Sequence, residues 1–216
     1  MADDDHDFEA MPGLPALPPR GETVLWQGRP DTWRLAVEAF GLNWIALYFL
    51  IVVAWRGSVG FGLAGVPGAL AYAIPYLGLA LAAGLLMLLL AWAQARATVY
   101  TVTTARVAMR IGAALSVTFN LPFAQIDSAA LDLRRGGTGT VALKLAAGGR
   151  LSYLVCWPHV RPWHFVTQPA LRCIPDAARV ARLIADAAEA RLTAPVVTRA
   201  AAPAAHAAQT AAIAAE

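Results

Sequence analysis

The sequence has little charge. Asp, Glu, Lys and Arg make up 14% of its 216 residues, whereas soluble globular chains usually contain about 25%. The charge is also unevenly placed, because positions 39–55 and 57–95 contain no charged residue. Together with a hydrophobic fraction of 58%, this deficit indicates contact with lipid. The net charge of +3 is too small to favour nucleic acid as a partner.

Residues that could support catalysis are scarce as well. The two cysteines, Cys156 and Cys173, have no neighbour at zinc spacing, and we expect both to be free thiols. Asp127 and Asp132 would point to opposite faces of a strand, which is poor geometry for paired carboxylates. No serine–histidine–aspartate order, phosphate-binding glycine loop or HExxH motif occurs. We therefore expect no catalytic residue, no metal site, no cofactor and no enzymatic activity.

The four histidines lie outside the apolar stretches. His6 and His206 are near the ends of the chain, and His159 and His164 are five residues apart beside Cys156. A metal site there would lack both ligand number and regular spacing, so packing or contact with a partner is favoured. Because the apolar spans contain no acid or base, a proton pump or ion transporter is not expected.

The charge-free stretches predict two transmembrane helices. A span needs about 20 mostly apolar residues, and residues 35–55 and 69–93 meet this length. Residues 57–68 contain five glycines and one proline, and they are predicted to form a loop. A third span through residues 57–76 is the alternative, which the glycines disfavour.

Arginines predict the orientation of these spans. Arg56 alone lies between them, and the others flank their outer ends: Arg20, Arg29, Arg34, Arg96, Arg106 and Arg110. The positive-inside rule then places both termini in the cytoplasm. Within the second span, Ala80 and Gly84 form a small-xxx-small pair that could pack against another helix. Alanine-rich spans also produce such pairs by chance.

After residue 96 the hydrophobic period changes to two. Alternating apolar residues predict strands over about 98–104, 106–111, 115–121, 129–134, 140–145 and 150–155. A short strand within residues 22–34, before the membrane entry, would place Val24 and Trp26 on one face. A helix is expected to begin at Pro175-Asp176 and to cover the sheet with one apolar stripe: Val180, Leu183, Ile184 and Ala187.

The predicted fold class is therefore α+β. Two transmembrane helices within residues 35–95 precede an antiparallel β domain, a barrel or sandwich over residues 96–192 that is capped by a C-terminal helix. Residues 156–174 are expected to be irregular. The acidic, proline-rich residues 1–21 and the alanine-rich residues 193–216 are expected to be disordered.

Two motifs carry a family resemblance. The segment 25–30 (LWQGRP) before the spans, with 100–107 (YTVTTARV) after them, resembles the bacterial membrane-anchored pleckstrin-homology-like (PH-like) family, whose members often carry Asn or Asp at the position of Thr104. The runs 161–165 (RPWHF) and 168–176 (QPALRCIPD), with the acidic start, are similar to the photosynthetic complex assembly proteins of purple bacteria. The resemblance covers about residues 3–192.

The resemblance implies a PH-like barrel of seven strands closed by a C-terminal helix, in the bacterial inner (intracytoplasmic) membrane. It also implies self-association, as in a homodimer, and a role in assembling the reaction centre and its light-harvesting complex. The partners would be subunits of these complexes or other assembly factors. Since no histidine lies in a span, a pigment-holding subunit is not expected, although transient pigment contact through other ligands stays open.

We expect partner docking to involve seven residues from two segments: Trp26, Gly28, Arg29, Trp163, His164, Gln168 and Arg172. The alternative for the aromatic segment 157–172 is that its rings plug the sheet near the bilayer. A second reading of the whole protein is a module that senses lipid headgroups through exposed strand arginines: Arg106, Arg110, Arg134 and Arg135. The simpler interpretation of those arginines is a solvated surface.

Overall fold

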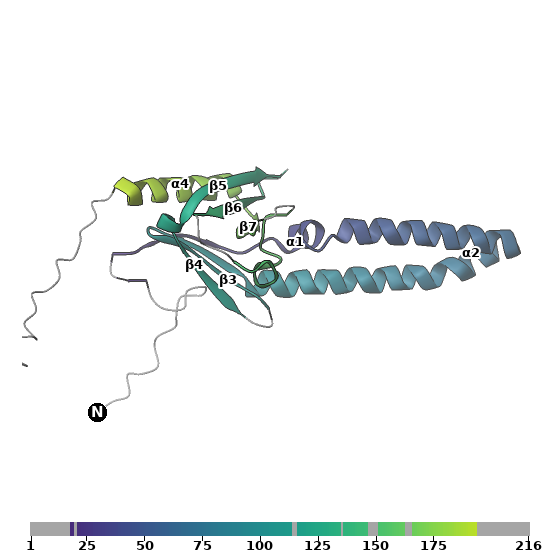
Figure 1. Cartoon of the computed structure of the whole chain (residues 1–216). Coiled ribbons are helices and arrows are strands. Elements are labelled where there is room, and N and C mark those ends of the chain that lie inside the picture. The colour runs from purple at the N-terminus through teal and green to yellow at the C-terminus, as the bar shows by residue number, and fades with distance from the viewer. Residues whose placement is uncertain are drawn as a thin grey trace, which may run out of the picture.

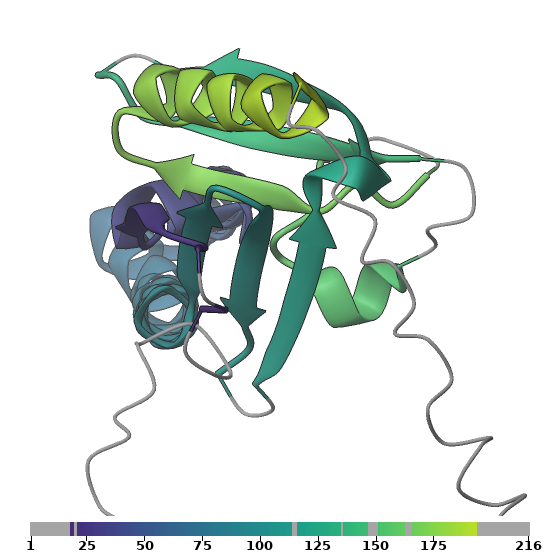
Figure 2. The same ribbon diagram turned by 90° about the vertical axis from the view of Figure 1, so that its left-hand side faces the viewer.

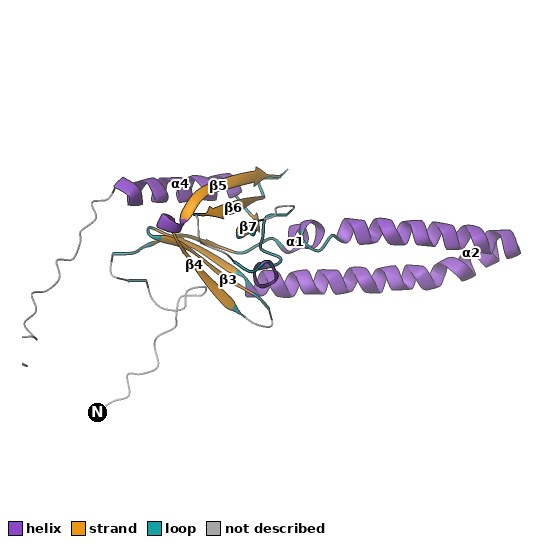
Figure 3. Cartoon of the chain, in the orientation of Figure 1, coloured by secondary structure: helices purple, strands orange, loops and turns teal. Residues whose placement is uncertain are grey.

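The computed structural model describes residues 18–19, 21–113, 116–134, 136–146, 151–162 and 166–193. A long helical hairpin projects from a domain of seven strands and a C-terminal helix, as Figure 1 shows. Figure 3 separates the helical part from the β part by colour. The α+β class and the antiparallel pairing predicted from the sequence are both present.

The strands form two antiparallel sheets. The first sheet has the order β1 (Val24–Gly28), β2 (Val99–Thr103), β3 (Arg106–Ile111) and β4 (Val117–Pro122). A short 3-10 turn, η1 (Phe123–Gln125), leads into the second sheet of β5 (Ile126–Leu133), β6 (Gly139–Leu145) and β7 (Ala170–Ile174). Strand β1 pairs with β2, so the segment before the hairpin is part of the domain that follows it.

The core lies between the two sheets and helix α4 (Ala177–Thr193). Figure 2 shows α4 lying along the second sheet. Three residues of its predicted stripe are buried: Val180, Ile184 and Ala187. Met109 of β3 is buried as its alternation predicts, but Ala108 on the opposite face is fully buried as well. Leu131 and Leu133 were expected to be buried and are 40% and 52% exposed. They belong to β5, which is an edge strand of the second sheet.

Two predictions in the C-terminal half are wrong. The expected strand over 150–155 is in part a short helix, α3 (Tyr153–Cys156). The segment 156–174, expected to be irregular, contains strand β7. All five residues of β7 are buried, because the core covers one face of the strand and the α1 region packs on the other. A strand buried on both faces shows no alternation in sequence.

The predicted first span also begins too early. Helix α1 (Thr32–Glu38) is capped by Asp31, whose side chain accepts a hydrogen bond from the Arg34 amide at 2.8 Å. Leu35 in α1 is fully buried against the domain, in a cluster with Ala95 and Cys173. Residues 35–38 therefore belong to the domain rather than to an apolar span, and α2 (Leu42–Ala97) begins four residues after α1 ends.

Helix α2 is the one helix of the described chain that is long and apolar enough to cross a membrane. Its helical dihedral angles break at Ala64 (φ −147°) and Gly65 (φ 61°), and the chain turns back there, so that α2 is a hairpin of two arms. The predicted loop 57–68 is thus helical except at these two residues. A Cβ at Gly60 or Gly68 would overlap the backbone of the other arm, so these glycines permit close helix packing rather than a loop.

Candidate docking site at the base of the hairpin

Both arms of the hairpin join the domain directly. Thr98 ends α2 and leads without a linker into β2. On the other arm, the backbone N–H of Asp31 donates to the Cys173 carbonyl at 2.8 Å, which ties the start of α1 to β7. Phe40 packs edge-on against Trp157, with 5.2 Å between ring centroids. The base of the hairpin is therefore held by β2, β7 and the segment around residue 157.

A buried polar network lies at this base. The His159 ring is fully buried, with Nδ1 2.6 Å from the Tyr100 hydroxyl and Nε2 3.1 Å from the Thr98 hydroxyl. The Tyr100 oxygen also accepts a hydrogen bond from the Arg172 backbone N–H at 3.3 Å. All three groups are satisfied if Tyr100 donates to Nδ1 and the Nε2–H donates to Thr98.

Burial sets the protonation of this network. Loss of hydration lowers the pKa of His159 to about 3, and the nearby Arg172 charge acts in the same direction. Burial also raises the pKa of Tyr100 well above its ordinary value. Both side chains are therefore neutral at physiological pH, and His159 is a structural histidine that fixes β2 against the segment before β7.

Arg172 is the charged residue of this region and is 6% exposed. Its Nη1 donates to the Pro158 carbonyl at 3.1 Å and its Nη2 to the Glu38 carbonyl at 3.0 Å. Its Nε is buried and has no hydrogen-bond partner among the described residues. No described carboxylate forms an ion pair with it. A buried guanidinium compensated only by carbonyl groups leaves an excess of positive charge at the site.

A cavity of about 350 Å³ lies over Arg172. Paired residues of β5 and β6 that alternate with the core residues line it, so it occupies the outer face of the second sheet. We call it the base cavity. Its lining residues come from α1, the second sheet and the segment before β7: Glu38, Ala130, Leu131, Asp132, Arg134, Thr140, Ala142, Arg161, Pro162 and Arg172.

The base cavity contains three arginines and two carboxylates, a net charge of +1. Arg134 forms ion pairs with Asp132 at 3.1 Å and with Glu38 at 3.7 Å. Arg161 donates to the Gln168 side-chain oxygen at 3.2 Å. The excess charge thus belongs to Arg161 and Arg172, which makes this side of the cavity suited to an anionic group of a partner.

The structure brings together only part of the predicted docking set. Arg172 lines the base cavity, and Gln168 holds a second lining residue, Arg161, in place. Trp163 and His164 lie outside the described residues. Sequence reasoning missed Glu38 as a residue that lines the cavity. In the sequence it was assigned to the membrane interface, and it reaches the cavity only because α1 packs on the domain.

The predicted docking residues on and beside β1 lie outside the base cavity. Trp26 is partly buried and packs against the core, and a Cβ at Gly28 would overlap its ring. Neither residue lines the base cavity, and Arg29 beside them is exposed. The contact between Trp26 and Gly28 gives the motif a structural role, and their place on a docking surface stays a prediction.

Ala80 and Gly84 line an apolar groove of about 340 Å³ between the arms, with Leu42, Phe49 and Leu77 among its other residues. A Cβ at Gly84 would meet no atom within 4 Å. This pair therefore leaves space between the arms instead of closing their contact, whereas at Gly60 and Gly68 the two backbones leave no room for a Cβ.

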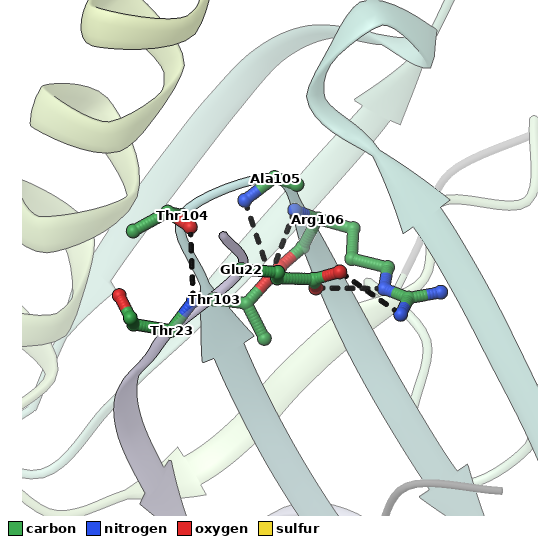
Figure 4. A network of polar contacts seen from close by, with 6 residues as sticks. All are labelled: Glu22, Thr23, Thr103, Thr104, Ala105 and Arg106. Carbon is green, nitrogen blue, oxygen red and sulfur yellow. Dashed lines mark hydrogen bonds and ion pairs between the residues drawn. The ribbon is translucent and has the colours of Figure 1, made fainter. Parts of the chain in front are cut away.

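Residues 100–107, the family motif that follows the hairpin, form the turn between β2 and β3 at the end of the domain away from the hairpin. Figure 4 shows Glu22 in a bidentate ion pair with Arg106, at 2.9 and 3.1 Å. Thr103 accepts from the Ala105 and Arg106 backbone N–H groups, and the Thr104 hydroxyl accepts from the Thr23 N–H. Short side-chain acceptors are suited to such turns, which accounts for the motif in terms of structure.

The arginines of the lipid-sensing alternative are dispersed. Arg106 is engaged with Glu22, Arg110 is exposed on β3, and Arg134 pairs with the acids of the base cavity. Arg135 lies outside the described residues. Arg106 and Arg110 lie on β3 of the first sheet and Arg134 follows β5 of the second, and headgroup binding by these arginines stays a prediction.

The bacterial PH domain family matches residues 39–188. An uncharacterized 23.7 kDa protein in the puhA 5′ region of Rhodobacter capsulatus is 52% identical over 203 residues, which cover 93% of this chain and 95% of that protein. No solved structure matches. Within the described residues, no group of three or more potential metal ligands occurs.

Proposed function

The chain belongs to the bacterial PH domain family, and from this premise we propose that it is a non-enzymatic assembly factor for the photosynthetic reaction centre and its light-harvesting complex. The observation that carries the proposal is the fusion of an apolar hairpin to a domain with a charged cavity at its base, in a protein whose relative is encoded in the puhA 5′ region. That location suggests a protein of a photosynthesis operon.

The hairpin would anchor the protein in the bacterial inner membrane. The first arm, from Leu42 to Ala64, spans about 33 Å at 1.5 Å per residue, close to the hydrocarbon thickness of about 30 Å. The second arm, from Gly65 to Ala97, is longer, at about 48 Å. Its outward side chains are large and apolar along the whole length, including Trp44, Leu63 and Leu81. With both arms joined to one domain, two crossings would place the domain and both termini on one side, which the arginine distribution favours as the cytoplasm.

Docking of partner subunits would use two surfaces. The base cavity offers Arg161 and Arg172 to an anionic group near the membrane surface, and the groove beside Gly84 offers an apolar surface within the membrane. A protein that holds partner helices while they assemble needs contacts of this kind and does not need a catalytic site. The charged groups of the base cavity are already engaged with protein groups, as a rigid recognition site requires.

A deletion strain tests the proposal. We expect lower reaction-centre and light-harvesting absorbance in membranes of the deletion strain, restored by the full chain. An Arg161→Glu variant should restore less, because it reverses the charge of the base cavity, whereas Arg110→Glu on the exposed face of β3 is the matched control. Normal absorbance in the deletion strain would refute the assembly role.

A second candidate is recognition of lipid headgroups, favoured by the excess positive charge of the base cavity beside α1. Full-length protein in nanodiscs with and without phosphatidylglycerol would test it. Arg161 would become protected from chemical modification of arginine only in the anionic nanodiscs. Equal modification in both lipids would exclude this candidate and leave a protein partner for the cavity.

A further inference from the structure

Between its two ends the hairpin carries one charged residue, since Arg96 lies in the last turn at the base. Arg56 is half-buried in the first arm, and its guanidinium carbon lies 5.1 Å from the ring centroid of Tyr72 and 5.3 Å from that of Tyr76 on the second arm. Its Nε is buried without a hydrogen-bond partner among the described residues. The sequence contains no acidic residue from 39 to 126, so the hairpin itself has no carboxylate for this cation.

The depth of Arg56 follows from its place on the helix. It lies 14 residues after Leu42, about 21 Å from the base, and eight residues, about 12 Å, before the break at Ala64. The two tyrosines lie about 10 to 17 Å from the break along the other arm. The rings therefore hold the guanidinium at this level instead of letting it extend toward the tip of the hairpin.

The tip offers no polar surface either. Residues 57–95 contain no charge, and Phe61, Leu63 and Val66 near the break are exposed. An apolar tip of this kind belongs at least partly in lipid. If the hairpin is inserted in the membrane as in the proposed function, on which this inference rests, Arg56 lies within the apolar half of the bilayer that is distant from the domain.

A cation at that depth requires compensation. An arginine within a membrane helix is costly to insert, and a desolvated cation–π contact offsets part of that cost. The rings accept no conventional hydrogen bond, so the N–H groups still need acceptors. A carboxylate supplies two acceptor oxygens in the geometry of the guanidinium fork.

We propose that Arg56, positioned by Tyr72 and Tyr76, is a docking point within the membrane for a partner transmembrane helix that carries a carboxylate at the same depth. A helix is favoured over a lipid phosphate, because the rings hold the guanidinium about 10 to 17 Å below the tip, where a phosphate does not reside. The hairpin also presents outward apolar side chains on both sides of this level, including Val59 and Ile74, against which a helix can pack.

The test uses full-length protein in phosphatidylcholine vesicles. The probes are synthetic leucine–alanine transmembrane peptides with one Glu at the depth of Arg56, with Gln at the same position, or with Glu near the opposite interface. Association is measured by energy transfer between labelled protein and labelled peptide. We expect the matched Glu peptide to associate at least fivefold more tightly than either control, and Arg56→Gln to abolish this difference.

Two further variants refine the result. Arg56→Lys keeps the charge without the fork and should retain part of the preference, and Tyr72→Leu should weaken it by releasing the guanidinium. Equal association of wild-type protein with the Glu and Gln peptides would overturn the inference, and this result does not depend on any variant. It would also be the result if a lipid phosphate already occupied Arg56. Such a result would leave the assembly role intact, since the deletion strain tests that role separately.

Discussion

Acidification should destabilise the protein through His159. The imidazole is fully buried, and both of its nitrogens lie within hydrogen-bond distance of neutral hydroxyl groups. Burial lowers its pKa from 6.5 to about 3 in the folded protein. Between these two values the unfolded chain binds a proton that the folded protein rejects, so stability is complete above pH 6.5 and falls as the pH decreases.

The magnitude follows from the two pKa values. Between pH 8 and pH 5 the folded protein should lose about 2 kcal/mol through His159 alone, since one unit of pKa corresponds to about 1.4 kcal/mol. The pKa of Glu22 is also lowered: burial raises it, but hydrogen bonds from Thr103 and Arg106 together outweigh burial. Its contribution is lost only below about pH 4.5, outside this window.

The assay is urea unfolding of the full chain in detergent micelles, followed by tryptophan fluorescence at pH 8, 7, 6 and 5. His159→Gln serves as the comparison, because glutamine keeps polar atoms near Thr98 and Tyr100 but does not titrate in this range. The variant will be less stable at pH 8, and its free energy of unfolding should change less between pH 8 and 5, by about 2 kcal/mol. Equal changes in both proteins would refute the assignment of a buried neutral histidine.

Three other perturbations have defined outcomes. Gly60→Leu should separate the arms of the hairpin, seen as a longer distance between spin labels on the two arms, whereas Gly78→Leu, where a Cβ meets open space, should not. Arg172→Lys retains the charge but cannot reach both carbonyl acceptors, and should lower the free energy of unfolding by about 1–3 kcal/mol in the same urea assay. Glu22→Gln should cost about 1–2 kcal/mol at pH 7 by weakening the pair with Arg106, and the difference from wild type should shrink as the pH falls below about 4.5, because protonation of Glu22 removes its charge. A cost that is the same at every pH would contradict the ion pair.

The sequence predicts best those helices and strands that have one buried face and one solvent-exposed face. Helix α4 carries a stripe through Ile184, because solvent covers the opposite side of the helix. Strand β7 has no such contrast, since α1 covers the face that the core leaves free. Glycine is ambiguous for a similar reason: Gly60 and Gly65 look alike in sequence, but one permits close packing and the other supplies a positive φ.

The base cavity could not be predicted, because its charges come from segments far apart in the chain. Glu38, Asp132, Arg161 and Arg172 lie on four different segments. The pairing of β5, β6 and β7 brings Asp132 near Arg172, and the docking of α1 on β7 adds Glu38. Sequence reasoning did identify Arg172, through a family motif and a mixture of aromatic residues and arginines. It did not identify the acceptors of Arg172, which are backbone carbonyls and therefore carry no residue signature.

The rigid junction between hairpin and domain fixes the position of a bound partner relative to the base cavity. Helix α2 continues into β2 through Thr98 alone, and the Thr98 hydroxyl is bonded to His159, so this arm has no flexible linker to the sheet. The other arm is held through Glu38, whose carbonyl accepts from Arg172. A partner bound along the hairpin is therefore placed at a fixed height and rotation relative to the base cavity. Two weak contacts in such a rigid arrangement act on one partner at high effective concentration, which favours an assembling complex whose membrane helix and anionic surface group match both sites at once.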